Sequence, residues 1–105
     1  MPISDARGDH ERHFVVKRRL IRSSVFVRTV KHLVKKQPHS AEDLRATLEL
    51  LSEDAFHPKL KTHKLKGALQ GSLACSAGYD LRIIFGFVQH EAILLQTVGT
   101  HDEVY

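Results

Sequence analysis

The sequence predicts an α+β domain in which a helical hairpin packs on a mostly antiparallel four-stranded sheet, in the order β-α-α-β-β-β. Three observations lead to this class. An apolar segment near the start is followed by two stretches with apolar residues at helical spacing, and the second half contains three runs typical of strands. The apolar faces of the helices need a flat partner. A sheet supplies it, and its other face is expected to stay partly open.

The composition is that of one ordinary globular domain. With 105 residues, 42% hydrophobic and 27% charged, the chain is long enough for a single modest core. Residues 1–12 are polar and without periodicity, which predicts a flexible leader before a domain at residues 13–105. The leader does not resemble a signal peptide, and no apolar run approaches the ~20 residues of a membrane helix. We therefore expect a cytoplasmic protein that is not associated with a membrane.

No metal or cofactor is expected. The single cysteine, Cys75, excludes a disulfide within the chain and argues against a thiolate zinc site. His10 and His13 have a spacing that can bind a metal, but the polar leader offers no third ligand nearby. The glycine-rich phosphate loop GxxxxGK followed by Ser or Thr is absent.

The first strand and the first helix are predicted before Pro38. Residues 14–21 (FVVKRRLI) begin apolar and alternate imperfectly, which favours a strand. Ser23 and Ser24 are suitable helix caps, because a hydroxyl can accept a hydrogen bond from the free amides of a first turn. Apolar residues then recur at i, i+4, i+7 and i+8, namely Phe26, Val30, Leu33 and Val34. The Gln37-Pro38 step is expected to end this helix.

A second helix is predicted after a short turn. Ser40 is expected to cap it, with Asp43 three residues later in a weak capping box. Leucines continue at helical spacing, at Leu44, Leu48 and Leu51. Pro58 lies beyond its end. The two helices would therefore form a hairpin with one leucine-rich face.

The remaining three strands are predicted in the second half. Residues 73–77 alternate, and residues 81–88 (LRIIFGFV) and 92–98 (AILLQTV) are apolar runs separated by a polar turn, which predicts a hairpin. By the two-residue period, one face of the run 81–88 carries Leu81, Ile83, Phe85 and Phe87. Arg82 falls on the other face.

Basic residues are separated from acidic ones along the chain. No acid lies between Glu11 and Glu42, a stretch that includes Lys17, Arg18, Arg19, Arg22, Arg28, Lys31, Lys35 and Lys36. None lies between Asp54 and Asp80 either, a stretch that contains Lys59, Lys61, Lys64 and Lys66. Two such blocks predict a positive surface that favours nucleic acid or an acidic protein segment.

Side chains suited to acid–base chemistry on a phosphate are concentrated between residues 63 and 105: His63, Asp80, Arg82, His101 and Tyr105. A histidine can act as acid or base near neutral pH, and an arginine can donate two hydrogen bonds to a phosphate. A fold that joins these segments could cleave RNA by attack of a 2′-hydroxyl, without a metal. From residue types alone, separate surface histidines and a simple Arg82–Asp80 ion pair remain alternatives.

Three segments of the sequence resemble the RelE/ParE superfamily of bacterial type II toxins, close to the YafQ-like messenger-RNA interferases. They are HKLKG at residues 63–67, GYDLRIIF at residues 78–85 and GTHDEVY at residues 99–105, within a resemblance that runs from about Phe14 to the C-terminus. The resemblance implies a RelE-like, microbial-ribonuclease-type sheet against two helices. It also implies an endoribonuclease that cuts messenger RNA on the ribosome.

The same resemblance implies a role for each site residue. His101 is expected to be the general acid, and Asp80 or His63 the general base. Arg82 falls where many RelE relatives carry a phosphate-binding arginine, and Tyr105 takes the place of a terminal phenylalanine that would stack on or orient a base. The expected contacts to the RNA backbone are point charges, Lys59, Lys61, Lys64 and Lys66.

The chain departs from the YafQ-like pattern at two positions, with Ser76 in place of a histidine and Leu81 in place of a tryptophan. Serine cannot transfer a proton at neutral pH and leucine offers no stacking surface, so the rate or the codon preference is expected to differ. Two alternatives follow: a ParE-like inhibitor of DNA gyrase, and a catalytically weak RNA- or ribosome-binding homologue. The histidines and Asp80 favour the nuclease, because a gyrase inhibitor needs no acid–base residues.

The expected partners are messenger RNA, the ribosome and a cognate antitoxin, with operator DNA contacted only through the antitoxin. The resemblance implies the antitoxin, and a basic open face suits an acidic wrapping segment. We expect acidic residues of that segment to meet Lys64, Lys66 and Arg82.

Overall fold

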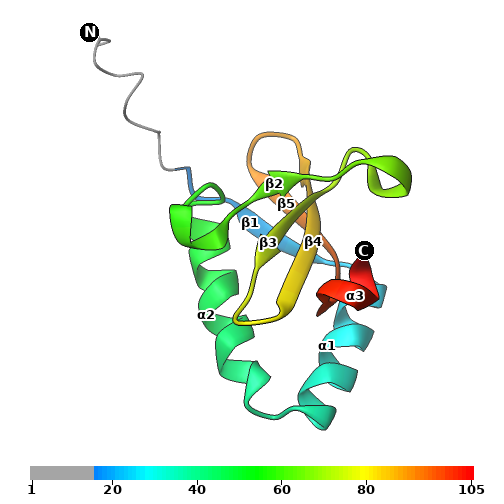
Figure 1. Cartoon of the computed structure of the whole chain (residues 1–105). Coiled ribbons are helices and arrows are strands. Elements are labelled where there is room, and N and C mark those ends of the chain that lie inside the picture. The colour runs from blue at the N-terminus through cyan, green and yellow to red at the C-terminus, as the bar shows by residue number, and fades with distance from the viewer. Residues whose placement is uncertain (1–15) are drawn as a thin grey trace, which may run out of the picture.

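The structure is a computed structural model that describes residues 16–105. Its elements in chain order are β1 (Arg19–Arg22), α1 (Ser24–Lys36), α2 (Ser40–Glu53), β2 (His63–Lys64), β3 (Leu73–Ser76), β4 (Leu81–Val88), β5 (Ala92–Thr100) and α3 (His101–Val104). Single 3-10 turns at Pro58–Leu60 and Gly67–Leu69 flank β2. Figure 1 shows the α1–α2 hairpin beside a twisted sheet, with α3 at the C-terminal end. The predicted leader and its His10/His13 pair lie outside the described residues.

The sheet has five strands, in the order β1-β5-β4-β3-β2. β1 runs parallel to β5, and the other neighbours are antiparallel. The predicted α+β class is confirmed, but the count of four strands was wrong because β2 adds a fifth. β2 has two exposed residues in a polar stretch, so no apolar alternation marks it in the sequence. Within residues 16–105, no helix is long and apolar enough to cross a membrane.

The first strand is shorter than predicted and starts later. Among the described residues β1 covers Arg19–Arg22, whereas the sequence predicted residues 14–21, of which 14 and 15 lie outside the described part of the chain. Pairing sets these limits, because the parallel register with β5 runs from Arg19 opposite Ala92 to Arg22 opposite Leu95. Just before β1, the Arg18 amide donates to the carbonyl of Ser52 in α2, at 2.8 Å. Distant backbone partners therefore decide where this strand begins.

One predicted helix cap is confirmed and the other was wrong. Ser23 caps α1, where its Oγ accepts from the amide of Phe26 at 3.0 Å, and Gln37 follows the last turn. Ser40, however, is the first residue inside α2, and the cap position is held by His39, which makes no side-chain cap bond. The Ser40 hydroxyl donates to Gln37 Oε1 at 3.3 Å instead. His39 already has helical dihedral angles, so the helix starts one residue earlier in the turn than the serine cap would require.

The core lies between the two long helices and one face of the sheet. It joins residues of α1, α2 and the sheet, including Phe26, Leu33, Leu44, Leu51, Leu73, Cys75, Ile83, Phe85, Ile93, Leu95 and Val98. Burying a side chain of this size contributes roughly 1.5–3 kcal/mol. The predicted common face of β4 points into the core except at Phe87, which is 38% exposed and packs against Phe56 with the two rings tilted. Ala74 and Ile84 are buried on the opposite face, so that face is only partly open.

Candidate active site

Strand pairing places two predicted site residues, His63 and Arg82, together with Ser76, on the face of the sheet that α1 and α2 do not cover. His63 of β2 lies opposite Ala74 of β3, and Ser76 of β3 lies opposite Arg82 of β4. Directly opposed residues of an antiparallel pair share a face. Since the neighbours Cys75 and Ile83 point into the core, the side chains of His63, Ser76 and Arg82 point to the other side.

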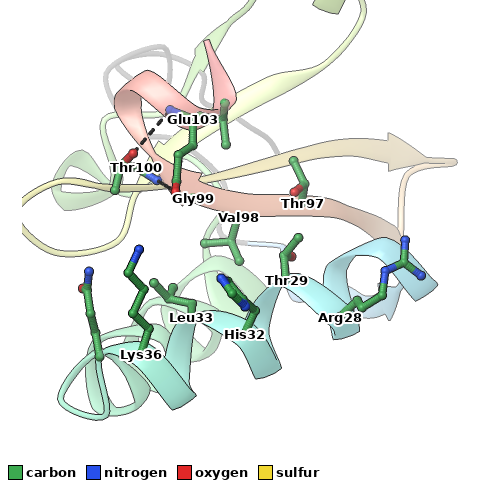
Figure 2. A pocket seen from close by; sticks show the side chains of 12 residues that line it. Arg28, Thr29, His32, Leu33, Lys36, Thr97, Val98, Gly99, Thr100 and Glu103 are labelled. Carbon is green, nitrogen blue, oxygen red and sulfur yellow. Dashed lines mark hydrogen bonds between the residues drawn. The ribbon is translucent and has the colours of Figure 1, made fainter.

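The short helix α3 brings the C-terminal residues to this face. The Thr100 amide donates to Glu103 Oε1 at 2.8 Å, and the Glu103 amide donates to Thr100 Oγ1 at 3.3 Å, which completes a capping box (Figure 2). A β-carbon at Gly99 would lie 2.9 Å from Glu103 Oε1 and 3.1 Å from Val104 Cγ1, so a larger residue there would require Glu103 or Val104 to shift. The amide of His101 donates to the carbonyl of Asp80 at 3.2 Å and joins α3 to the β3–β4 turn.

Tyr105 links the two predicted histidines. Its hydroxyl oxygen lies 3.3 Å from His63 Nε2. Its ring meets the His101 ring edge-on, with centroids 4.5 Å apart and an interplanar angle of 86°. Two histidines that are far apart in the sequence therefore flank one phenol.

Hydrogen bonding selects the tautomer of the neutral His63 ring. Its Nδ1 lies 3.0 Å from the carbonyl of Lys61, and a carbonyl can only accept, so Nδ1 carries the proton of the neutral ring. Nε2 is then the acceptor for the Tyr105 hydroxyl. Partial burial raises the pKa of the Tyr105 phenol, opposed by the nearby charge of Arg82, so the hydroxyl stays protonated and donates at neutral pH. Lys61, whose carbonyl contacts His63 Nδ1, has a left-handed backbone with φ at 52°.

Arg82 and Asp80 lie beside this cluster without pairing. Arg82 is half-buried and donates through Nη1 to the carbonyl of Leu81 at 2.9 Å. Among the described residues no ion pair joins it to Asp80, so the alternative of a simple Arg82–Asp80 pair is not what the structure shows. Asp80 is exposed and reaches the cluster through its carbonyl contact with His101.

Sequence reasoning missed a carboxylate next to His101. Asp102 Oδ1 lies 3.7 Å from His101 Nδ1, which is an ion-pair distance when the imidazole is protonated. The two residues are adjacent in GTHDEVY, but neighbours along a chain face each other only in certain backbone conformations. The capped turn of α3 supplies that conformation. In residues 16–105, no group of three or more His, Cys, Asp or Glu is arranged to hold a metal ion.

The four predicted RNA-binding lysines are all exposed but do not form one patch. Lys59 and Lys61 line a hollow of about 440 Å³ together with Arg82 and Ser76. Lys64 and Lys66 line a different hollow, beside residues 70–73. Strand alternation turns Lys64 to the face opposite His63. The first two lysines are therefore close to the cluster, while the other two lie on another side of β2.

These features define a class: a small α+β domain with exposed basic residues and a cluster of two histidines and a tyrosine on the open face of its sheet. The family described as "Bacterial toxin of type II toxin-antitoxin system, YafQ" matches residues 18–105. The chain belongs to this family, which confirms the predicted placement among RelE/ParE-type toxins. No curated protein is a significant match to the sequence.

Solved structures of related toxins have the same fold. The crystal structure of YafQ from E. coli strain BL21(DE3) is similar with a TM-score of 0.70 and 20% identity, over 85% of this chain and 99% of that chain. The E. coli DinJ-YafQ toxin–antitoxin complex gives a TM-score of 0.67 and 22% identity, over 86% and 99%. A metal-bound toxin from Helicobacter pylori gives 0.67 and 28%, over 83% and 98%.

Proposed function

We propose that this toxin is an endoribonuclease that cleaves messenger RNA on the ribosome, in the cytoplasm, without a metal ion. The observation that carries the proposal is the contact of Tyr105 with both His63 and His101, on the face of the sheet that also presents Arg82. An acid, a base and a guanidinium on one open face are the groups that cleavage by a 2′-hydroxyl requires. RNA carries this nucleophile itself, so only proton transfers and charge stabilisation are left to the protein.

The geometry supports a distinct role for each group. His63 Nε2, unprotonated in the tautomer that Lys61 selects, accepts the proton of the 2′-hydroxyl when the substrate displaces the Tyr105 hydroxyl. The 2′-oxygen then forms a bond to phosphorus, the bond from phosphorus to the 5′-oxygen breaks, and protonated His101 gives its proton to the departing oxygen. The Asp102 carboxylate lies 3.7 Å from Nδ1 of this imidazole. Arg82 stabilises the charge that develops on the phosphoryl oxygens, and Asp80 stays the alternative base.

An antitoxin is proposed to neutralise the toxin by covering this face. Type II toxins act in pairs, and the structural relative in the DinJ-YafQ complex is bound to its antitoxin. Exposed cations around the cluster suit an acidic segment of the partner. Because Lys64 and Lys66 lie apart from Arg82, one segment has to wrap around β2 to meet all three.

The test measures how fast wild type and His101→Ala cleave a defined messenger RNA. Each protein is assayed in a purified translation reaction and, separately, on the same RNA without ribosomes. Removal of a general acid is expected to lower the cleavage rate by roughly 10²–10⁴-fold. His39→Ala is the matched control, because His39 is exposed at the α1–α2 turn and makes no side-chain cap bond. It should cleave like wild type.

Three results would contradict the nuclease proposal. Cleavage that survives His101→Ala would remove the acid from the mechanism. Cleavage of a message carrying a 2′-deoxy sugar at the cut site would exclude 2′-hydroxyl attack. Growth arrest without cut message, accompanied by inhibited DNA supercoiling, would favour the gyrase inhibitor.

A further inference from the structure

A second cationic feature lies on the side of α3 away from the histidine cluster. It is a groove of about 500 Å³ between α1, the end of β5 and α3, which we call the α1–β5 groove. Arg28, His32 and Lys36 line it from α1, where the spacing of four residues places them on one helical face. The facing wall includes Thr97, Gly99, Thr100, Glu103 and Val104. Figure 2 shows the three α1 side chains directed toward β5 and α3.

The positive charge of the groove is little compensated. α1 contains no acidic residue, and Glu103 is the acid that lines the groove. The hydrogen bond from the Thr100 amide lowers the pKa of Glu103, and the charges of Lys36 and His32 lower it further, so this carboxylate is ionised but already engaged. Two basic residues, Arg28 and Lys36, and a histidine therefore face a single carboxylate.

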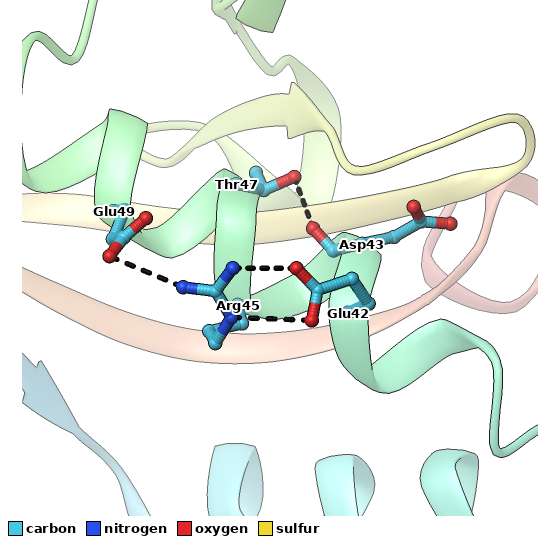
Figure 3. A network of polar contacts seen from close by, with 5 residues as sticks. All are labelled: Glu42, Asp43, Arg45, Thr47 and Glu49. Atoms are coloured by element: carbon cyan, nitrogen blue, oxygen red, sulfur yellow. Dashed lines mark hydrogen bonds and ion pairs between the residues drawn. The ribbon is translucent and has the colours of Figure 1, made fainter.

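On the other long helix, α2, acidic side chains neutralise the basic residue. On α2, Arg45 lies 2.6 Å from Glu42 and 3.3 Å from Glu49 (Figure 3). Hydrogen bonding to Arg45 lowers the pKa of Glu42, so the pair is ionised on both sides. The one cation of α2, Arg45, is thus paired with acids, whereas α1 carries Arg28, Lys31, Lys35 and Lys36 and no acid of its own.

The arrangement of the groove suits a phosphodiester backbone. Residues four apart in a helix are about 6 Å apart along its axis, comparable to the separation of neighbouring phosphates in an extended strand. Apart from the imidazole of His32, none of the lining residues is aromatic, so bases find no stacking platform. Contacts of this kind hold the backbone and carry no sequence information.

We propose that the α1–β5 groove binds the phosphate backbone of the RNA strand next to the cleaved linkage. The inference rests on the proposed nuclease function. α3 connects the two sites, because His101 and Tyr105 belong to the cluster while Glu103 and Val104 line the groove. A strand that leaves the cluster across α3 enters the groove directly. An acidic protein segment is the competing occupant, and this continuity favours RNA.

The test measures binding of a fluorescent single-stranded 2′-O-methyl RNA, which cannot be cleaved by 2′-hydroxyl attack, as a function of salt. The groove variant is Arg28→Gln/Lys36→Gln. The control is Lys31→Gln/Lys35→Gln, which removes the same charge from exposed positions of the same helix that do not line the groove. Loss of two phosphate contacts is expected to flatten the log–log salt slope by about 1.4 and to weaken binding roughly tenfold or more near 0.1 M salt. The control should bind RNA within about threefold of wild type, since it removes only long-range electrostatic attraction, which salt screens.

Equal losses of RNA affinity in the two variants would overturn the proposal, because they would show that RNA responds to the overall positive charge of α1 and does not bind specifically in the groove. A groove variant that binds RNA like wild type but no longer binds a glutamate-rich peptide would also overturn it, in favour of an acidic protein. Cleavage of the matching unmodified RNA is measured in parallel. Selective loss of binding in the groove variant supports RNA binding in the groove even if wild type does not cleave RNA. If the groove variant binds RNA normally and wild type cleaves it, the groove proposal is refuted and the nuclease proposal stands. Thermal unfolding of each variant verifies that it is folded.

Discussion

Tyr105 is the residue at which the contacts of the candidate site converge. Its hydroxyl donates to His63, its ring packs against His101, and the charge of Arg82 acts on its phenol. Hydroxyl and ring thus serve different partners. The hydroxyl orients the proposed base, and the ring supports the proposed acid.

Substitution at Tyr105 separates these two contributions. Tyr105→Phe keeps the ring but removes the exposed hydrogen bond that orients His63 before the substrate displaces the hydroxyl. Such a bond is typically worth about 0.5–1.5 kcal/mol, so we expect a cleavage rate lower by roughly 2–10-fold. Tyr105→Ala removes the ring as well and should lower the rate further. Initial cleavage rates measured across the pH range provide the comparison. A Tyr105→Phe protein with the wild-type profile would show that the hydroxyl does not position His63.

At the scale of elements, α1 and α3 both begin with a hydroxyl side-chain cap, but the two helices depend on their caps to different degrees. Ser23 caps the long helix α1, and Thr100 caps the four residues of α3. α1 is also held by its buried apolar face, whereas α3 has no buried residue. The position of His101 therefore depends on the capping box much more than α1 depends on Ser23.

This difference predicts opposite outcomes for two similar substitutions. Thr100→Ala and Ser23→Ala each remove a cap worth about 1 kcal/mol. Thr100→Ala is expected to let α3 fray and to lower cleavage roughly 10–100-fold through misplacement of His101. Ser23→Ala should lower the free energy of unfolding and leave the rate within about twofold. Hydrogen exchange at the Tyr105 amide, which donates to the His101 carbonyl at 3.1 Å, reports the fraying directly. Unchanged exchange in Thr100→Ala would contradict this account.

For the whole molecule, one core joins both helices to the sheet, and Cys75 lies inside it. Burial raises the pKa of the Cys75 thiol to about 12, so the thiolate that reacts with electrophiles hardly forms in the folded state at ordinary pH. Reaction of this thiol therefore requires opening of the core. It provides a probe of global stability that does not depend on activity.

Leu51→Ala tests that core. Leu51 is 0% exposed on α2, and truncation of such a leucine is expected to lower the free energy of unfolding by about 2–5 kcal/mol. Labelling of Cys75 should accelerate by the same factor as the unfolding equilibrium constant rises. Val27→Ala, at a position 37% exposed on α1, is the control and should change stability by about 0.5 kcal/mol or less. Labelling that is fast in wild type would show that Cys75 is accessible without unfolding.

The sequence by itself determined the elements that have a strong local signal. The α+β class, the apolar stripe of α1, the Ser23 cap and the β4–β5 hairpin follow from periodicity and cap chemistry, which act over a few residues. The residue types in residues 63–105 also suggested a cluster, because histidines, a carboxylate, an arginine and a phenol are suited to acid–base chemistry on a phosphate. Each of these features can be predicted from the residues of the segment in which it occurs.

Only the tertiary structure decided the features that need a partner distant in the chain. β2 exists because β3 pairs with it, β1 ends where its pairing with β5 ends, and Lys64 faces away from His63 because of that pairing. The Tyr105–His63 contact and the α1–β5 groove each join segments far apart in the sequence. Hydrogen bonds and packing between distant segments depend on the tertiary arrangement of the whole chain. Local residue patterns do not specify which distant segments come into contact.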